Sequence, residues 1–171
     1  MSEKPKYNTT ARCSCGSVTL EVNGPPITSV VCYCDDCQEG SRQIEALPNA
    51  RLVRDPDGGT CYVLYRKDRV RFSRGAHLVK GYKIREKSPT SRIVATCCNS
   101  AMILNFDDGK WWVDVYRASI HGDVLPLQMR ICTKFKSGNS DVPSDVPSYS
   151  TFPVKFIAKL IAAKIAMLLH R

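Results

Sequence analysis

The sequence predicts a mainly β domain that is followed by a linker and a C-terminal α-helix. Between Ala11 and Lys136, short segments rich in β-branched and aromatic residues alternate with Gly, Pro and Asp. A stretch rich in Ser and Pro comes next, and the chain then shows apolar residues at helical spacing. We therefore expect a small β-sheet domain at 1–136, a linker at 137–150 and an amphipathic helix at 151–171. A chain of 171 residues can bury a core without disulfide support.

Seven segments of the domain are predicted as strands because β-branched and aromatic side chains favour extended chain. They are Ser17–Val22, Thr60–Arg66, Arg69–Ser73, His77–Lys83, Arg92–Thr96, Ala101–Phe106 and Trp111–Arg117. The segments Asp55–Gly59 and Asp107–Lys110 carry residues that tolerate turn conformations. No repeat and no long helical period is found in this part of the chain.

The last segment is predicted as a helix because Thr151 can cap it and Pro153 fits its first turn. Its broad apolar face consists of Phe156, Ile157, Leu160, Ile161, Ile165, Leu168 and Leu169. A membrane span is not expected, because Lys155, Lys159 and Lys164 would each cost about 2.5–3.5 kcal/mol near the bilayer centre. Three contacts are possible for this apolar face: it can dock on the domain, pair with a second copy in a homo-oligomer or lie at a membrane interface.

Cysteine usage points to a reducing compartment. The chain has 9 cysteines, an odd number, and it is larger than the usual disulfide-stabilised domain. The first residues, MSEKPKYNTT, include no apolar segment of a secretory signal, so a cytoplasmic location is expected. Thiols in that compartment are free, catalytic or bound to metal.

The net charge indicates possible binding partners, and the missing motifs argue against several enzyme classes. A net charge of +9 favours binding to nucleic acid, to an anionic membrane surface or to an acidic substrate. No Gly-rich phosphate loop or dinucleotide fingerprint occurs. None of the 3 histidines stands beside a Ser or Cys as in a hydrolytic triad.

Two separated cysteine pairs predict one metal site. Cys13 and Cys15 are two positions apart, so their side chains point to the same side of extended chain, and Gly16 allows the backbone to turn closely. The pair Cys97 and Cys98 follows a predicted strand and can add one or two sulfur ligands. Four thiolates would make a closed tetrahedral zinc site of the structural kind.

A third cysteine group is denser and predicts a second metal site. Cys32, Cys34 and Cys37 offer three soft ligands within six residues, on what the sequence predicts to be a tight turn. Three protein ligands leave one coordination position open, as in catalytic zinc sites, so one to two zinc ions are expected in all. Buried free cysteines and a redox Cys-x-x-Cys pair are the alternatives. Cys61 and Cys132 stand alone in apolar stretches and are expected to be inert core thiols.

These motifs resemble the glutathione-dependent formaldehyde-activating enzyme family, which includes centromere protein V-like proteins and has an Mss4-like zinc fold. The resemblance runs from about Arg12 to Phe106 and rests on three family motifs in this order: Cys-x-Cys-Gly, Cys-His-Cys-x-x-Cys and Cys-x-x-Cys-Gly. It implies a structural zinc held by the first and last motifs. It also implies a zinc at the site of the glutathione adduct, held by Cys32, Cys34 and Cys37.

Two departures distinguish this chain from the family pattern. Tyr33 stands where the family usually has His. The last motif reads Ala95-Thr96-Cys97-Cys98-Asn99, so Cys98 matches the family directly and Cys97 does not. Neighbouring residues of a regular strand point to opposite faces, so Cys97 can ligate only if the backbone changes locally. The resemblance therefore describes a divergent member.

Two hypotheses of function follow, one enzymatic and one not. In the first, the open zinc site deprotonates a thiol such as glutathione, and the protein acts as a carbon–sulfur lyase on a thiol–aldehyde adduct. A group of basic residues can then meet the glutathione carboxylates or simply form a solvated hairpin. These are Arg66, Lys67, Arg69, Arg71 and Arg74.

In the second hypothesis the zinc is structural and the domain binds nucleic acid or a protein. Trp111, Trp112 and Tyr116 would then stack on bases beside the basic residues, although such residues more often pack in a sheet. An open coordination position distinguishes the two, because only an enzyme needs one.

Overall fold

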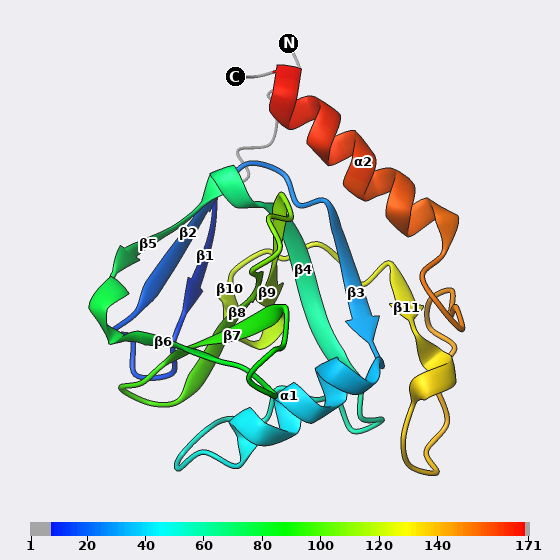
Figure 1. The fold of residues 1–171 in the computed structure, drawn as a ribbon, viewed down its shortest axis with the longest axis horizontal. Coiled ribbons are helices and arrows are strands. Elements are labelled where there is room, and N and C mark those ends of the chain that lie inside the picture. Colours follow the sequence, from blue (N-terminus) through cyan, green and yellow to red (C-terminus); the bar gives the residue numbers. More distant parts are fainter. Residues whose placement is uncertain (1–7, 170–171) are drawn as a thin grey trace.

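The computed structural model describes residues 8–169 and shows two β-sheets with a helix at the C-terminal end (Figure 1). The predicted mainly β fold class with a C-terminal α-helix is therefore confirmed. The predicted start of the domain at residue 1 and the last two residues of the predicted helix, 170–171, lie outside the described residues. So do most of the residues on which the absence of a secretory signal was judged.

The smaller sheet has four antiparallel strands in the order β10-β1-β2-β5. These strands are β10 (Ile120–His121), β1 (Asn8–Arg12), β2 (Thr19–Asn23) and β5 (Val70–Arg74). The larger sheet has seven strands in the order β11-β3-β4-β9-β8-β7-β6, and only the β11–β3 pair is parallel. Its strands are β11 (Met129–Ile131), β3 (Thr28–Cys32), β4 (Thr60–Arg66), β9 (Trp112–Tyr116), β8 (Ser100–Phe106), β7 (Thr90–Ala95) and β6 (Val79–Tyr82).

The helix α1 (Asp35–Glu45) was not among the elements predicted before the linker. The buried face of α1 is mostly polar or small, so it shows no apolar period in the sequence. This face consists of Cys37, Gln38, Gly40, Ser41 and Ile44. Short 3-10 helices complete the chain: η1 (Lys67–Arg69), η2 (Ala76–Leu78), η3 (Arg117–Ser119) and η4 (Thr133–Phe135).

The apolar core lies on both faces of the larger sheet. Along β4, Tyr62 and Leu64 join one cluster of buried residues, whereas Val63 and Tyr65 join the other. Because successive side chains of a strand point to opposite faces, the two clusters are separated by the sheet. One cluster lies between the two sheets, and the other lies beneath α1 and the C-terminal helix (Figure 1).

The segment 137–150, predicted as a linker, is held against the domain at several points. Ser137 donates its backbone N–H to Oε1 of Gln38 at 3.1 Å. Arg130 on β11 binds the Asp145 carboxylate, with Nε 3.0 Å from Oδ1. The backbone N–H of Tyr149 donates to the carbonyl oxygen of Arg130 at 2.9 Å. These contacts fix the position from which the last helix starts.

The helix α2 (Val154–Leu169) packs one side of its apolar face on its own domain. Phe156 and Leu160 are buried, and Trp111 donates Nε1–H to the carbonyl oxygen of Leu160 at 2.8 Å. The exposed apolar residues of the helix are Val154, Ile157, Ile161, Ile165, Leu168 and Leu169. Within residues 8–169, no helix is both long enough and apolar enough to cross a membrane.

Candidate metal centres and the adjoining cavity

The first and last cysteine pairs meet in a four-thiol cluster. The sulfur–sulfur distances are 3.6 Å for Cys13–Cys15, 3.9 Å for Cys13–Cys97, 3.4 Å for Cys15–Cys97 and 3.9 Å for Cys97–Cys98. A tetrahedron with zinc–sulfur bonds of about 2.3 Å has sulfur–sulfur edges of about 3.8 Å. The four thiols therefore fit a tetrahedral zinc ion.

A turn explains how two adjacent cysteines reach the same site. Residues 96–99 form the turn between β7 and β8, and the Cys98 backbone N–H donates to the carbonyl oxygen of Ala95 at 3.3 Å. Asn99 has a positive φ of 51°, a conformation that Asn tolerates better than most residues. Since neither Cys97 nor Cys98 lies in a strand, the strict alternation of a strand does not separate their side chains.

The middle cysteines form a second cluster at the start of α1. Cys32 ends β3, Cys34 occupies the N-cap of α1, and Cys37 lies in the first helical turn. Their sulfur atoms all lie within 4.8 Å of one another. Cys32 and Cys37 are buried and Cys34 is partly exposed. Three convergent soft ligands of this kind fit zinc with one coordination position left over.

The electrostatics of this cluster favour a thiolate at Cys34. Hydrogen bonds from Cys32 and Cys37 lower the pKa of Cys34 to about 3, with a further contribution from the positive charge of Arg92. The guanidinium group of Arg92 is buried beside the cluster and donates to the hydroxyl of Thr90 and to the carbonyl oxygen of Asp36. Bound metal would take the place of the shared protons.

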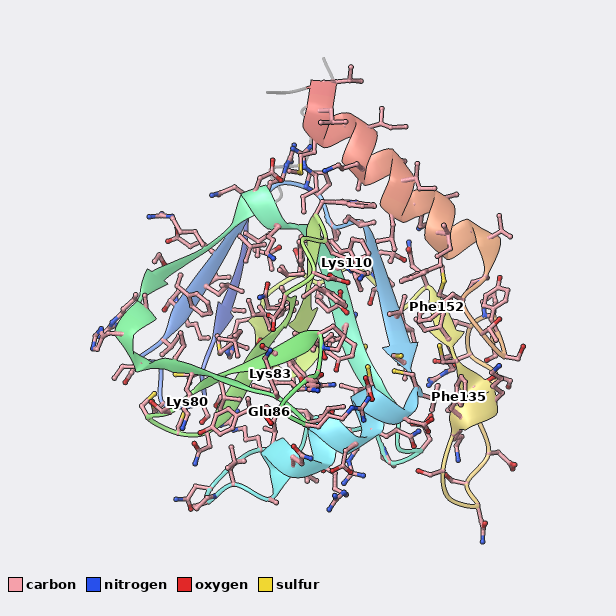
Figure 2. All side chains as sticks on the ribbon, in the orientation of Figure 1. Lys80, Lys83, Glu86, Lys110, Phe135 and Phe152 are labelled. Atoms are coloured by element: carbon pink, nitrogen blue, oxygen red, sulfur yellow. The ribbon has the colours of Figure 1, made fainter. Side chains whose placement is uncertain are left out.

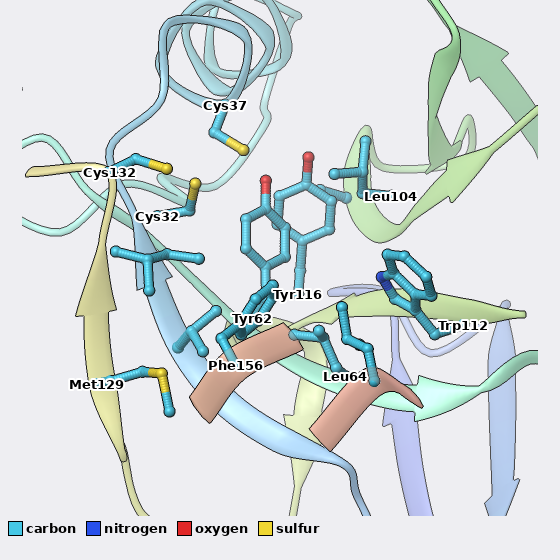
Figure 3. Packing of buried hydrophobic residues seen from close by; sticks show 14 of the residues in the cluster. Cys32, Cys37, Tyr62, Leu64, Leu104, Trp112, Tyr116, Met129, Cys132 and Phe156 are labelled. Carbon is cyan, nitrogen blue, oxygen red and sulfur yellow. The ribbon is translucent and has the colours of Figure 1, made fainter. Parts of the chain in front are cut away.

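Cys132 lies beside this cluster, which the sequence did not indicate. Cys132 follows β11, and the parallel pairing of β11 with β3 places Ile131 opposite Cys32. A hydrogen bond with the Cys132 thiol is the largest of the effects that raise the pKa of Cys32 (Figure 3). Cys132 is buried as expected, but its thiol contacts a candidate ligand. Cys61, in contrast, stays a partly buried thiol on β4 whose pKa burial raises to about 11.

Tyr33 is directed away from the metal cluster and joins a buried ionic network. Its hydroxyl donates to Oδ2 of Asp57 at 2.6 Å and accepts from Nη1 of Arg130 at 2.6 Å. Arg130 also pairs directly with Asp57 at 3.1 Å. Burial raises the pKa of Tyr33, so the phenol stays neutral. The residue that replaces the family's His therefore links β3, the turn before β4 and β11.

A cavity of about 300 Å³ adjoins the middle cluster, and all three of its cysteines line the wall. Most of the other lining residues are apolar and come from the larger sheet and from α2. They include Val30, Leu64, Leu104, Phe106, Trp112, Ile131, Phe152, Phe156, Ile157 and Leu160. Charged lining residues are few and lie among these apolar ones: Asp36, Arg92, Lys110 and Asp114. Such a cavity has the size and lining of a small-molecule site.

Four buried polar atoms in and around this cavity have no hydrogen-bond partner among residues 8–169. They are the hydroxyl oxygens of Tyr62 and Tyr116, Nε of Arg92 and Oδ1 of Asp114. Figure 3 shows both tyrosine hydroxyls pointing to the side where Cys37 lies. Burial raises the pKa of Asp114 to about 8, and the negative charge at Cys34 adds to this shift. Buried polar groups are normally paired, so four unpaired atoms in one region indicate a place for a ligand.

The basic residues expected to meet glutathione lie elsewhere. None of Arg66, Lys67, Arg69, Arg71 and Arg74 lines the cavity. Arg66 pairs with Asp68, and Arg71 pairs with Glu21 on β2. Trp112 and Tyr116 are buried, so their rings are not free to stack on bases. Among the lining residues, the sequence did not indicate Tyr62, Arg92 and Asp114, since each stands alone in a strand without a motif.

Residues 8–50 match the family model of the glutathione-dependent formaldehyde-activating enzyme. The predicted family resemblance is confirmed. The match covers about a quarter of the chain and includes five of the candidate ligands, from Cys13 to Cys37, whereas Cys97 and Cys98 lie beyond it. The crystal structure of a Rhodobacter sphaeroides protein is 19% identical, with a TM-score of 0.48, over 68% of this chain and 91% of that chain. No curated protein sequence matches the chain.

Proposed function

We propose that the protein is a zinc-dependent carbon–sulfur lyase that acts on a thiol–aldehyde adduct at Cys32, Cys34 and Cys37. The observation that carries this proposal is the contrast between the two clusters. Four thiols complete a tetrahedral site at Cys13, Cys15, Cys97 and Cys98, whereas three thiols line a cavity. A closed site is structural, and an open one beside a cavity can bind a substrate.

A substrate thiol that took the open coordination position of a zinc ion would be held as its thiolate at neutral pH. The protein contributes the surroundings. Three cysteine thiolates give a site of net negative charge with zinc, which favours thiol chemistry over activation of water. The buried guanidinium of Arg92 offsets this charge. The apolar walls exclude water from the adduct, which limits competing hydrolysis.

Glutathione is the thiol that the name of the matched family suggests. The compartment inferred from the cysteines, the cytoplasm, supplies such thiols in reduced form. We propose one zinc ion per cluster when both are filled. A homo-oligomer through the exposed part of α2 belongs to the same set of proposals.

The test is to replace zinc by Co²⁺ and to record the visible spectrum while glutathione is added. A change in the spectrum of the parent protein is expected, and it should disappear in Cys34→Ser. Cys61→Ser is the matched control, since Cys61 lies outside both clusters, and it should respond as the parent does. NMR exchange between formaldehyde and its glutathione adduct, with and without the zinc protein, then measures catalysis.

The outcome also separates the two hypotheses of function. If the spectrum of a fully loaded protein ignores glutathione and other small thiols, the lyase proposal is wrong. The alternative, a zinc module that binds nucleic acid or a protein, would then be favoured by the net charge of +9.

A further inference from the structure

The cavity beside the middle cluster is larger than a one-carbon substrate needs. Formaldehyde is comparable in size to one or two water molecules, each of which has a share of roughly 30 Å³ in the liquid. The cavity measures about 300 Å³. If only formaldehyde were bound, most of the apolar wall would face empty space or disordered water, and neither arrangement is favourable. The volume therefore requires a larger apolar group.

The walls do not suit the peptide part of glutathione either. That part carries two carboxylates and an ammonium group, whose burial without partners is costly. The charged groups that line the cavity already have partners or are themselves buried. Lys110 pairs with Asp108, and Asp36 pairs with Arg85 at 3.1 Å. The thiol's charged part would thus lie outside, and the cavity would receive the carbon side of the adduct.

The polar atoms define which end of that ligand lies near the metal cluster. Tyr62, Arg92 and Asp114 line the cavity, and each has a buried atom without a hydrogen-bond partner among residues 8–169. The ring of Tyr116 is 4.9 Å from that of Tyr62, so the two phenols form a pair. A single hydroxyl group on the ligand, at the carbon bound to sulfur, can accept from Tyr62 or Arg92 and donate to Oδ1 of Asp114. The rest of the ligand would meet α2 and the side chains of Leu104 and Trp112, which are labelled in Figure 3. Figure 2 labels Lys110 and Phe152, which also line the cavity.

From these three observations we infer that the substrate is an apolar aldehyde with an alkyl or aryl group, bound as its thiohemiacetal. In the forward step the thiol sulfur forms a bond to the carbonyl carbon, and the π electrons of C=O move to oxygen. The proton that the thiol released ends on that oxygen. The lyase direction reverses these changes, so no oxidant or reductant is needed. This inference rests on the thiol-adduct function proposed above.

Helix α2 makes the cavity specific for such a group. Phe156, Ile157 and Leu160 form the wall contributed by the helix. Ile161, one turn beyond Ile157, is equally apolar but does not line the cavity, and both side chains are about half exposed, at 42% and 50%. The two positions therefore offer a matched pair of substitutions on one helix.

Two stable thioethers test the inference in the zinc-loaded full chain by titration calorimetry. S-methylglutathione represents the one-carbon adduct, and S-hexylglutathione represents an apolar one. Each buried methylene group increases affinity about fourfold, so the hexyl compound is expected to bind at least tenfold more tightly. Ile157→Glu should remove this preference without a change in zinc content, whereas Ile161→Glu should keep it.

Three results separate failure of this inference from failure of the proposed function. Equal affinity for the two thioethers, in a protein whose cobalt spectrum responds to glutathione, overturns the inference and leaves the lyase proposal in place. Loss of the hexyl preference in Ile161→Glu as well as in Ile157→Glu also overturns it, since the preference would then come from the outer surface of α2. If glutathione has no effect on the spectrum but hexanal alone quenches tryptophan fluorescence, the apolar site stands and the thiol chemistry fails.

Discussion

Replacement of Tyr33 by Phe removes one hydroxyl group from a buried ionic network and leaves the ring in place. The hydroxyl bonds two charged groups, Asp57 and Arg130, each at 2.6 Å. Hydrogen bonds to charged groups contribute about 1.5–3 kcal/mol each. Because Arg130 keeps its direct contact with Asp57 at 3.1 Å, the loss of stability should be smaller than the contribution of two full hydrogen bonds. We expect the free energy of unfolding to fall by about 2–4 kcal/mol.

Thermal unfolding followed by circular dichroism, at fixed zinc concentration, measures this change. A domain of this size loses roughly 2–4 °C in Tm per kcal/mol, so the decrease should be roughly 5–15 °C. Tyr62→Phe is the control, because the Tyr62 hydroxyl is buried without a partner among residues 8–169. Its removal should leave Tm unchanged or raise it. Both variants should keep the parent's zinc content.

The reasoning is wrong if Tyr33→Phe unfolds at the temperature of the parent. It is also wrong if the variant keeps its stability but loses metal from Cys32, Cys34 and Cys37. In that case Tyr33 would act on the metal site, and its contacts with Asp57 and Arg130 would be incidental.

Three further changes test other parts of the structure. Cys15→Ser should remove one zinc equivalent and destabilise the fold by several kcal/mol, since binding of structural zinc contributes directly to folding; a soluble variant with parental Tm and zinc content would contradict this. Cys132→Ser should weaken metal binding at the middle cluster in a chelator competition, because Cys132 contacts Cys32, while Cys61→Ser should not. Deletion of 151–171 should leave the zinc content unchanged but lower solubility and abolish binding of S-hexylglutathione, because it uncovers the cavity wall; unchanged solubility and binding would show that α2 does not close the cavity.

The strands rich in β-branched and aromatic residues could be predicted from the sequence, whereas β3 and α1 could not. All seven predicted strands overlap an observed strand, because these segments are rich in the β-branched and aromatic residues that favour extended chain. Strand β3 was missed because its buried residues, Thr28–Cys32, do not alternate and include no aromatic residue. Helix α1 was missed because its buried face is held by polar contacts. Gln38, for example, donates to the carbonyl oxygens of Tyr33 and Phe135.

The cysteine clusters could also be predicted from the sequence, whereas the cavity beside the middle cluster could not. The candidate ligands form local motifs that the sequence shows directly, and the family resemblance implied that the first and last motifs share one site. The cavity depends on contacts between residues far apart in the sequence, which no local pattern predicts. The parallel pairing of β11 with β3 brings Cys132 to Cys32, and α2 packs Phe156 against the larger sheet. Arg92 reaches the cluster only because Gly40 of α1 has no side chain. A Cβ atom at Gly40 would lie 2.0 Å from Nε of Arg92.

Gly40 therefore links the fold of α1 to the charge at the candidate active site. Gly in a helix interior costs about 1 kcal/mol relative to Ala, so its presence in α1 needs a compensating reason. The close approach of Arg92 supplies one, because the guanidinium needs that space to lie beside the three thiols. The positive charge of Arg92 partly balances their negative charge in a cavity that otherwise offers mostly apolar surface. Gly40 thus lowers the local stability of the helix, and a buried cation lies next to the candidate metal site.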